Sequence, residues 1–292
     1  MKDKICLVTG ATSGIGEVTA QALAQMGATV VAVGRDPQRG AATLERIKKA
    51  APNARVEFML ADLSSQAQIR QLVQEFKRNY ARLDVLVNNA GSVFLARKQS
   101  VDGFEMTFAL DHLNYFLLTN LLLDTMKGCA QTHSCARIVN VSSNAHRRVP
   151  GMNFGDLQSE RGYNSLQAYA QAKLANLLFS YELARQLEGT NITVNALHPG
   201  VVATDIWLAD TRFRRNNGVL RKLVTRLTRL VMINPEQGAQ TSIYLATSPD
   251  VEIVTGRYFV NEKEAISSSA SYDQAAALRL WQMSEAMTEL SD

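Results

Sequence analysis

A tyrosine and a lysine four residues apart are one candidate in this 292-residue chain for residues whose types and spacing could do chemistry. Tyr169 and Lys173 stand in the segment "YAQAK", inside a predicted helix near 165–187, so their side chains would share one helix face. A phenol with its ordinary pKa of about 10 is a poor base at neutral pH. A lysine ammonium one turn away lowers that pKa because it stabilises the phenolate. The pair is therefore a candidate general acid or base, although the same spacing also occurs on ordinary surface helices.

A glycine-rich stretch near the N-terminus is the second candidate. The segment "TGATSGIG" (9–16) follows the apolar run "ICLV" and precedes a helical pattern. Gly10 would make the tight turn after the strand, Gly14 would let the backbone approach a diphosphate, and Gly16 would let the helix pack closely on the sheet. Because the first amides of a helix attract anions, the stretch predicts dinucleotide binding.

Short β-branched runs alternate with helical patterns along the chain and must position these residues. Continuous apolar strands that alternate with helices predict an α/β fold: a Rossmann-type doubly wound parallel sheet of about seven strands, in the order 3-2-1-4-5-6-7, with helices on both faces. The chain is predicted to be a single domain, 1–292, with an insertion near 201–232 that breaks the alternation. The predicted strands cover 4–9, 28–34, 55–60, 84–89, 136–142, 192–197 and 257–260, and the predicted helices lie near 15–26, 37–50, 66–79, 102–126, 165–187 and 236–247.

The composition is typical of a soluble globular protein, with 46% hydrophobic residues, 20% charged residues and a net charge of +4. No basic tail or zinc-finger spacing suggests a nucleic acid as partner. Cys6, Cys129 and Cys135 lack metal-ligand spacing, so they are expected to be reduced thiols and no metal is expected. No apolar run has the length of a signal peptide core or of a membrane span, so a cytoplasmic location is expected.

The spacing G-x-x-x-G-x-G with Thr9 ahead of it resembles the short-chain dehydrogenase/reductase family. Further motifs of that family follow in the same order over nearly the whole chain. They are Asp62-Leu63, Asn88-Asn89-Ala90-Gly91, Ser142-Ser143, Tyr169-Ala170-Gln171-Ala172-Lys173, Pro199-Gly200 and Thr204.

The side chain at the end of the second predicted strand distinguishes NAD from NADP as the cofactor. A carboxylate there would bind the adenosine ribose of NAD and repel a 2′-phosphate, but this position is Gly34. Arg35 follows it and Arg39 lies one helical turn on, and arginine pairs well with phosphate. We therefore expect NADP(H) rather than NAD(H), the alternative being that Arg35 is a solvated loop residue near Asp36.

The family resemblance implies where the rest of the cofactor lies. Asp62 and Leu63 would line the adenine pocket, the segment 89–91 would pass the adenosine ribose, and Lys173 would also bind the nicotinamide ribose. The residues expected at the cofactor are Gly10, Thr12, Ser13, Gly14, Ile15, Gly16, Arg35, Arg39, Asp62, Leu63, Asn89, Ala90, Gly91, Tyr169, Lys173, Pro199, Gly200 and Thr204.

The resemblance also assigns catalytic roles. Ser143 would orient the substrate oxygen, with Ser142 as the lesser candidate, and Tyr169 would act as general acid or base. The family usually carries an asparagine that holds a water in a proton relay to the lysine, but this chain has Asp111 at that position. An ionised aspartate accepts hydrogen bonds and cannot donate them. Asp111 could therefore act through a water, Asn114 could take part, or turnover could be slow.

The segment between Ser143 and Tyr169, with its F-x-D-L-Q element, together with "KLANLLF", resembles the retinol dehydrogenase branch of the family. This resemblance implies a hydrophobic aldehyde, ketone, alcohol or retinoid-like substrate. Protochlorophyllide oxidoreductase is a relative with the same Tyr/Lys pair and fits less well. The tail "AALRLWQMSEAMTEL" resembles the closing helix of the branch, in which Trp281 is expected to pack. His112, beside Asp111, is expected to be a packing or surface residue rather than a catalyst.

The insertion 201–232 follows the sixth strand, where such sheets bind ligands, and is predicted to be a substrate lid. Leucines recur at helical spacing among basic residues near its end, so the alternatives are a weak membrane-surface contact through 218–232 and an ordinary surface helix. Trp207 and Phe213 are candidates to line the pocket.

Three further expectations stay open. The chain could be a nicotinamide-binding regulatory or scaffold protein with little turnover, or an epimerase or dehydratase acting on a nucleotide sugar. Many members of the family pair through long helices beside the sheet, here near 102–126 and 165–187, so a homo-oligomer is expected.

Overall fold

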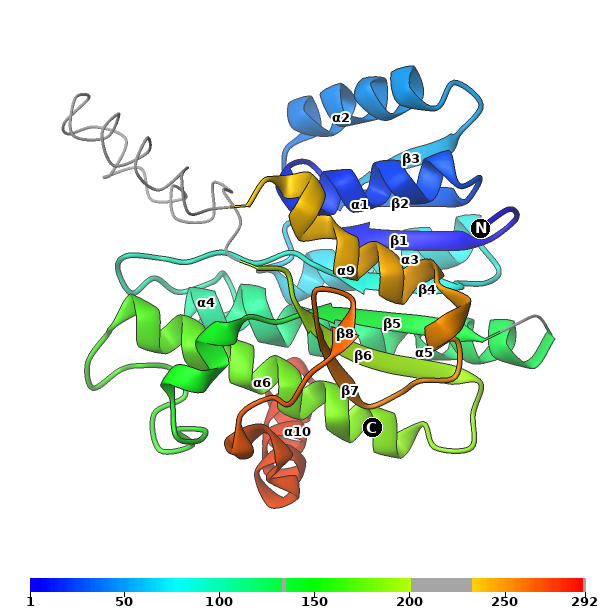
Figure 1. Cartoon of the computed structure of the whole chain (residues 1–292). Coiled ribbons are helices and arrows are strands. Elements are labelled where there is room, and N and C mark those ends of the chain that lie inside the picture. The colour runs from blue at the N-terminus through cyan, green and yellow to red at the C-terminus, as the bar shows by residue number, and fades with distance from the viewer. Residues whose placement is uncertain (133–134, 201–232, 291–292) are drawn as a thin grey trace.

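The fold is built on one sheet whose strand order was predicted from the sequence. The computed structural model describes residues 1–132, 135–200 and 233–290. Within these residues the sheet has eight strands in the order β3-β2-β1-β4-β5-β6-β7-β8 (Figure 1), so the Rossmann-type order is confirmed. The strands are β1 Ile5–Thr9, β2 Thr29–Gly34, β3 Arg55–Leu60, β4 Val85–Asn88, β5 Ala136–Val141, β6 Ile192–His198, β7 Arg257–Val260 and β8 Lys263–Glu264.

The last strand, β8, was not predicted. It has two residues and pairs antiparallel with β7, while every other pairing in the sheet is parallel. Asn261 and Glu262 connect the two strands with positive φ angles of 51° and 63°. So short a strand has no apolar alternation of its own, and only the tight turn after β7 brings it into register.

Helices cover both faces of the sheet. Alternate side chains of a strand point to opposite faces, so Leu7 of β1 joins one core while Cys6 and Val8 join the other. The core on one face takes residues from α1, α2 and α9, and the core on the other takes residues from α3, α5, α6 and α10. The helices are α1 Gly14–Gln25, α2 Pro37–Ala50, α3 Gln66–Asn79, α4 Met106–Phe108, α5 Asn114–Thr132, α6 Ser165–Gln186, α9 Pro235–Thr247 and α10 Gln274–Thr288.

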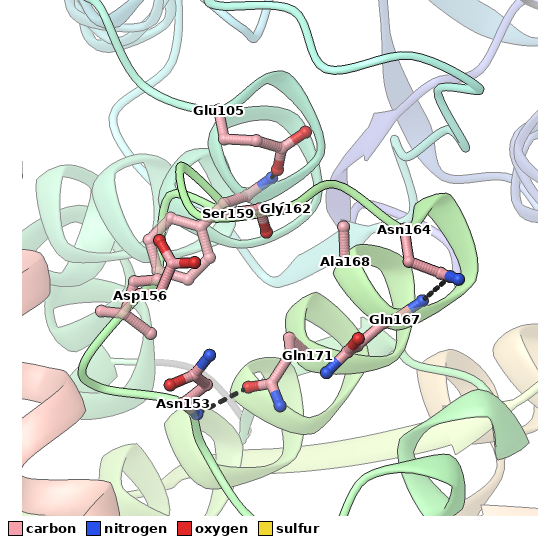
Figure 2. A pocket seen from close by; sticks show the side chains of 11 residues that line it. Glu105, Asn153, Asp156, Ser159, Gly162, Asn164, Gln167, Ala168 and Gln171 are labelled. Carbon is pink, nitrogen blue, oxygen red and sulfur yellow. Dashed lines mark hydrogen bonds between the residues drawn. The ribbon is translucent and has the colours of Figure 1, made fainter.

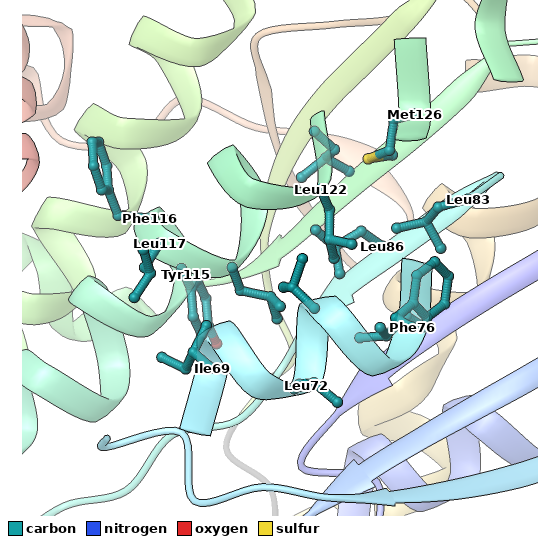
Figure 3. Close-up of a cluster of buried hydrophobic side chains, with 14 of the residues drawn as sticks. Ile69, Leu72, Phe76, Leu83, Leu86, Tyr115, Phe116, Leu117, Leu122 and Met126 are labelled. Carbon is teal, nitrogen blue, oxygen red and sulfur yellow. The ribbon is translucent and has the colours of Figure 1, made fainter. Parts of the chain in front are cut away.

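Helices α3 and α5 pack together over the sheet (Figure 3). Ile69, Leu72 and Phe76 recur at intervals of three and four, so α3 presents one apolar face. These side chains meet Tyr115 and Leu122 of α5, and all five are at most 2% exposed. Full burial of each large apolar side chain stabilises the fold by about 1.5–3 kcal/mol, so this cluster holds α5 firmly against the strands.

The helix predicted near 102–126 begins later than expected. Gly103 has a φ of +85°, and the amide of Ser100 donates to the carbonyl of Phe104, so this stretch is a turn. A left-handed glycine cannot continue a right-handed helix. Glu105 instead caps α4, because its carboxylate accepts from the amides of Thr107 and Phe108.

The same predicted helix is interrupted between α4 and α5. Residues Ala109–Leu113 form a π-helical turn, which inserts an extra residue into the helical register. Such turns are rare and occur frequently at functional sites. Asp111 lies at the middle of this turn and is fully buried.

The C-terminal helix α10 packs on α6. Trp281 of α10 stacks on Phe179 of α6 with ring centroids 5.8 Å apart, and meets Phe116 of α5 edge-on at 4.9 Å. The packing role expected for Trp281 is confirmed. Helix α10 therefore covers aromatic residues of α5 and α6, the helices through which copies of the chain were expected to pair, and that pairing stays a prediction.

The predicted lid near 201–232, with Thr204, Trp207 and Phe213, lies outside the described residues. Across the part of the chain that the structure describes, no helix combines the length and the apolar character needed to cross a membrane.

Candidate active site

The glycine-rich turn lies where β1 ends and α1 begins. Gly10 has a φ of +63°, which a glycine adopts without strain. A Cβ on Gly16 would lie 2.4 Å from the carbonyl oxygen of Gly10 and 2.5 Å from Nδ2 of Asn89. The expected roles of these two glycines, a tight turn and a close helix–strand contact, agree with the structure. Gly14 also has a positive φ, of 57°.

Hydrogen bonds lock this turn to the end of β4. The Thr9 hydroxyl accepts from the amides of Asn89 and Ala90 at 2.8 and 3.0 Å. The Asn89 side chain donates back to the carbonyl oxygens of Thr9 and Gly10, at 2.9 and 3.4 Å. Asn89 therefore shapes the turn, and its amide group is already used within the protein.

The N-terminus of α1 suits a diphosphate. Ser13 precedes the helix as its N-cap residue but is exposed, and its side chain makes no capping hydrogen bond. The first amides of a helix have no partner inside the helix and carry the positive end of its dipole. This end, together with Thr12, Gly14 and Ile15, is therefore available to an anionic ligand, and the residues present fit the expected dinucleotide.

Two arginines follow β2 and lie near the glycine-rich turn, one directly after the strand and one in the first turns of α2. A Cβ on Gly34 would lie 2.6 Å from Cγ2 of Thr12, so the glycine lets the end of β2 pack closely against the Thr12 side chain. Arg35 follows and is exposed, and the Arg39 guanidinium donates to the carbonyl of Thr12 at 3.4 Å. Asp36 caps α2 by accepting from the amides of Gln38 and Arg39. The carboxylate nearest Arg35 in the sequence is thus used by the helix.

Further expected cofactor residues lie after β3 and β6. Asp62 holds its own turn, because its carboxylate accepts from the amide and hydroxyl of Ser64. The Leu63 side chain is 4% exposed and belongs to the core, which leaves its backbone for a ligand. Pro199 and Gly200 are half-buried after β6, and Gly200 has a φ of +89°.

Lys173 and Asp111 form an ion pair at the centre of the site. Nζ of Lys173 lies 3.1 Å from Oδ2 of Asp111, and the two side chains are 3% and 0% exposed. The ammonium also donates to the carbonyl of Val141 at the end of β5, at 3.3 Å. Burial opposes the charge of Lys173, but Asp111, Tyr115 and Tyr169 together outweigh it, and the pKa of Lys173 is raised above its ordinary value.

The lysine ammonium also lies close to two phenol rings. Its Nζ is 5.4 Å from the ring centroid of Tyr169 and 5.6 Å from that of Tyr115. Burial raises the pKa of Tyr169, Lys173 lowers it, Asp111 raises it, and a hydrogen bond with Ser143 lowers it. The structure therefore brings together the four residues expected to be catalytic. Lys173 acts on the pKa of Tyr169 in the predicted direction, but burial and Asp111 outweigh it and leave that pKa above its ordinary value.

The two serines after β5 have different partners. The Ser142 hydroxyl donates to the backbone carbonyl of Lys173 at 2.8 Å, so it holds α6 against β5. Ser143 accepts from the amide of Ala145 and begins a short 3-10 helix that was not predicted. Ser143 is thus the serine of the pair that faces Tyr169.

Two neighbours of Asp111 have structural partners. The amide of the Asn114 side chain donates to the carbonyl of Leu110 at 2.5 Å, inside its own helix. His112 is fully buried and lies 2.9 Å from the hydroxyl of Ser284 on α10. Burial lowers the pKa of His112 to about 3, so the ring is neutral and packs in the core as expected.

Sequence reasoning missed Ser92 and Tyr115 at this site, and it assigned Gly91 to the cofactor rather than to Asp111. The amide of Ser92 donates to Oδ1 of Asp111 at 2.8 Å, and Gly91 leaves room for the carboxylate, because a Cβ there would lie 2.9 Å from its Oδ2. Tyr115 lies one turn after Asp111, and its hydroxyl donates to the carbonyl of Val141 at 3.3 Å. The spacing of Tyr115 from Asp111 was the only signal in the sequence.

A hollow of about 430 Å³, open to solvent, lies beside the start of α6 (Figure 2). It is lined by Gln167, Ala168 and Gln171, together with loop residues such as Asn153 and Asp156. The Gln171 side chain accepts from the amide of Asn153 at 3.0 Å and thereby fixes the loop. Tyr169 and Lys173 do not line this hollow, so it is separate from the catalytic cluster.

The sheet order, the glycine turn and the Tyr169–Lys173 pair define a dehydrogenase of the Rossmann type. The profile of the short chain dehydrogenase family matches residues 4–214. The chain belongs to this family and is an oxidoreductase of the kind that transfers hydride.

Its relatives place the chain on the retinol dehydrogenase-like branch. It is 42% identical to human polyprenol dehydrogenase over 292 residues, which cover 99% of this chain and 86% of that protein. It is 42% identical to mouse retinol dehydrogenase 14, and the alignment covers 98% of this chain and 86% of that protein. It is 37% identical to a chloroplastic short-chain dehydrogenase, TIC 32 A, from Brassica napus, and the alignment covers 99% of this chain and 89% of that protein.

Solved structures agree with the fold. An uncharacterised protein from Mycobacterium paratuberculosis has a TM-score of 0.76 and 30% identity, covering 99% of this chain and 94% of that one. The RhlG/NADP active-site complex of Pseudomonas aeruginosa has a TM-score of 0.69 and 28% identity, covering 93% and 97%. Among the residues described here, no group of three or more His, Cys, Asp or Glu side chains could hold a metal ion.

Proposed function

We propose that this protein is an NADP(H)-dependent oxidoreductase that interconverts a hydrophobic alcohol and its aldehyde or ketone. The observation that carries the proposal is the buried Lys173 ammonium beside the Tyr169 ring, at 5.4 Å, with Ser143 on the same phenol. This arrangement puts a proton donor and a hydroxyl at the end of β5, on the edge of the sheet where the glycine turn also lies.

The chain's own residues handle the oxygen of the substrate. Ser143 orients the carbonyl oxygen, and Tyr169 gives it a proton during reduction or takes one from the alcohol during oxidation. Lys173 stabilises the phenolate, because an ammonium close to a phenol favours its charged form. The bound nicotinamide supplies or accepts the hydride.

The preference for NADP(H) follows from the end of β2. The position at which a carboxylate would repel a 2′-phosphate is Gly34, which packs against Thr12 and carries no charge. Arg35 is exposed, and Arg39 already reaches the glycine turn at the Thr12 carbonyl. Two guanidinium groups there favour a phosphate because arginine pairs with its oxygens in a planar, bidentate geometry.

The substrate class is supported by the relatives, which include a polyprenol dehydrogenase and retinol dehydrogenases. Both names describe long, apolar alcohols. A retinoid-like or polyprenol-like alcohol, or the matching carbonyl compound, is therefore the first class to test.

The test is NADPH oxidation over a panel of apolar aldehydes and ketones, with Tyr169→Phe as the control. Loss of turnover in that variant with cofactor binding retained supports the enzyme. Tight NADPH binding without turnover on any panel member would favour the regulatory or scaffold protein instead.

The cofactor assignment has its own test. Arg35→Ala is expected to weaken NADPH binding at least tenfold and NADH binding little, since only the 2′-phosphate loses a partner. Fluorescence titration of both nucleotides measures this, and equal losses would contradict the assignment. Glu45→Ala, on the same helix as Arg39, is a matched surface control that should leave both affinities unchanged.

A further inference from the structure

The family's usual asparagine is replaced here by a residue that changes the charge of the site. Asp111 lies in the π-helical turn and touches Lys173 directly, at 3.1 Å, without room between them for a water. Its other oxygen accepts from the Ser92 amide at 2.8 Å. Both side chains of the pair are almost fully buried, so little solvent screens their charges.

We propose that Asp111 is a positioning residue that anchors Lys173 by direct contact and offsets part of its charge, so that Tyr169 is kept as a proton-donating phenol for carbonyl reduction. This inference rests on the proposed function, because it concerns the same tyrosine. It goes beyond that function by assigning the direction that the site favours at neutral and mildly alkaline pH.

The geometry fixes what each group can still do. An ammonium has three N–H donors. In the described part of the chain Lys173 donates one to the Val141 carbonyl, and its charge pairs with the Asp111 carboxylate at 3.1 Å. At least one donor is left for a ribose hydroxyl. Anchoring by Asp111 therefore keeps Lys173 in place without using all of its hydrogen bonds.

The proton balance explains why the charge of Asp111 matters. In reduction, hydride bonds to the carbonyl carbon, the C=O electron pair moves to the oxygen, and the Tyr169 O–H gives its proton to that oxygen. The hydride comes from the reduced nicotinamide, which is oxidised, and solvent later returns a proton to the phenolate. Reduction therefore needs Tyr169 protonated beforehand, whereas oxidation needs the phenolate.

The other titratable groups that face this cluster do not replace Asp111. Tyr115 faces Lys173 from α5, and burial raises its pKa, so it stays neutral. His112 is neutral because burial lowers its pKa to about 3. Glu105, which caps α4, raises the pKa of Asp111. Asp111 in turn raises the pKa of Tyr163, whose own burial is the larger cause.

The main test follows the ionisation of Tyr169 without any substrate. Ultraviolet titration of tyrosinate is compared between the wild type and Asp111→Asn. From each titration curve, the curve of the same protein with the additional substitution Tyr169→Phe is subtracted, which leaves the signal of Tyr169. Removing the negative charge should lower the midpoint of Tyr169 by about one pH unit, because the Lys173 ammonium, which the Val141 carbonyl and the two phenols still hold, is then no longer offset by a carboxylate. An unchanged or higher midpoint would overturn the proposal.

The pH profile of turnover gives a second readout. The alkaline limb of carbonyl reduction should move down by the same amount in Asp111→Asn, while the KM for NADPH changes less than kcat. If the wild type turns nothing over, the proposed function fails, but the tyrosinate titration still decides the inference. If the wild type turns over and the limb does not move, the inference fails alone.

Two further variants separate charge from structure. Gly91→Ala keeps every charge but places a Cβ 2.9 Å from Oδ2 of Asp111, so it should displace the carboxylate and shift Tyr169 in the same direction by less. It decides the question if Asp111→Asn does not fold. Asp84→Asn removes another buried carboxylate that pairs with Lys4 and Arg82, and it should lower stability without moving the Tyr169 midpoint.

Discussion

Replacing Gly16 by alanine tests the close contact on which the cofactor turn depends. The new Cβ would lie 2.4 Å from the Gly10 carbonyl oxygen, and reaching an ordinary contact of 3.4 Å requires a separation of about 1 Å. The contacting atom is backbone in a turn with positive φ, so it cannot move aside as a side chain would. Overpacking of this kind costs about 1–3 kcal/mol, and the helix preference of alanine returns about 0.5–1 kcal/mol.

The matched control is Gly128→Ala in α5, where a Cβ meets nothing within 4 Å. There only the helix preference acts, so the free energy of unfolding should rise by about 0.5–1 kcal/mol. Urea unfolding of both variants should therefore differ by about 2 kcal/mol, with Gly16→Ala the less stable.

The cofactor gives a second measurement on the same pair. Moving the start of α1 by about 1 Å displaces the amides expected at the diphosphate, and a loss of about 1.4 kcal/mol weakens NADPH binding tenfold. Gly128→Ala should bind NADPH as the wild type does. Equal stability of the two alanine variants would refute the close packing of α1 on the turn.

Two other predictions concern the core and its response to acid. Trp281→Ala should lower the free energy of unfolding by about 3–5 kcal/mol, because Trp281 is only 8% exposed, stacks on Phe179 and meets Phe116 edge-on. Leu278→Ala on the same helix, at 49% exposed, should change it by less than about 0.5 kcal/mol. Similar effects of the two substitutions would argue against the packing of α10. Burial lowers the pKa of His198 from 6.5 to about 4, so the unfolded chain takes up the proton first and stability should fall as the pH drops from about 6.5 towards 4. His198→Asn should flatten that slope in urea unfolding at several pH values, while His112, whose pKa is also lowered, keeps part of it. A slope identical to that of the wild type would contradict this assignment.

Much of the fold could be predicted because its signals are local. The strand of β1, the turn at Gly10 and the helix of α1 follow from an apolar run, a glycine and a helical pattern that are adjacent in the chain. The pair Tyr169–Lys173 needs only the period of one helix. The location of the protein in the cell, expected to be cytoplasmic, stays a prediction. The roles of the individual site residues also stay predictions.

The errors lie in the helix predicted near 102–126, where two interruptions break a continuous apolar pattern. The helix near 102–126 begins only at Met106, because Gly103 takes a left-handed conformation and the side chain of Glu105 caps the next turn. The π-helical turn at Ala109–Leu113 has no sequence signature of its own, and within it His112 lies against Ser284 of α10.

The sequence by itself therefore predicted the glycine-rich turn and the Tyr169–Lys173 pair, because each depends on residues close together in the chain, and the alternation of strands and helices predicted the order of the sheet. Only the tertiary structure shows what Asp111 contacts. It brings a carboxylate from a π-helical turn to 3.1 Å from an ammonium on α6 and excludes water from both. Burial strengthens the attraction between opposite charges, and burial depends on packing between helices that no local pattern encodes.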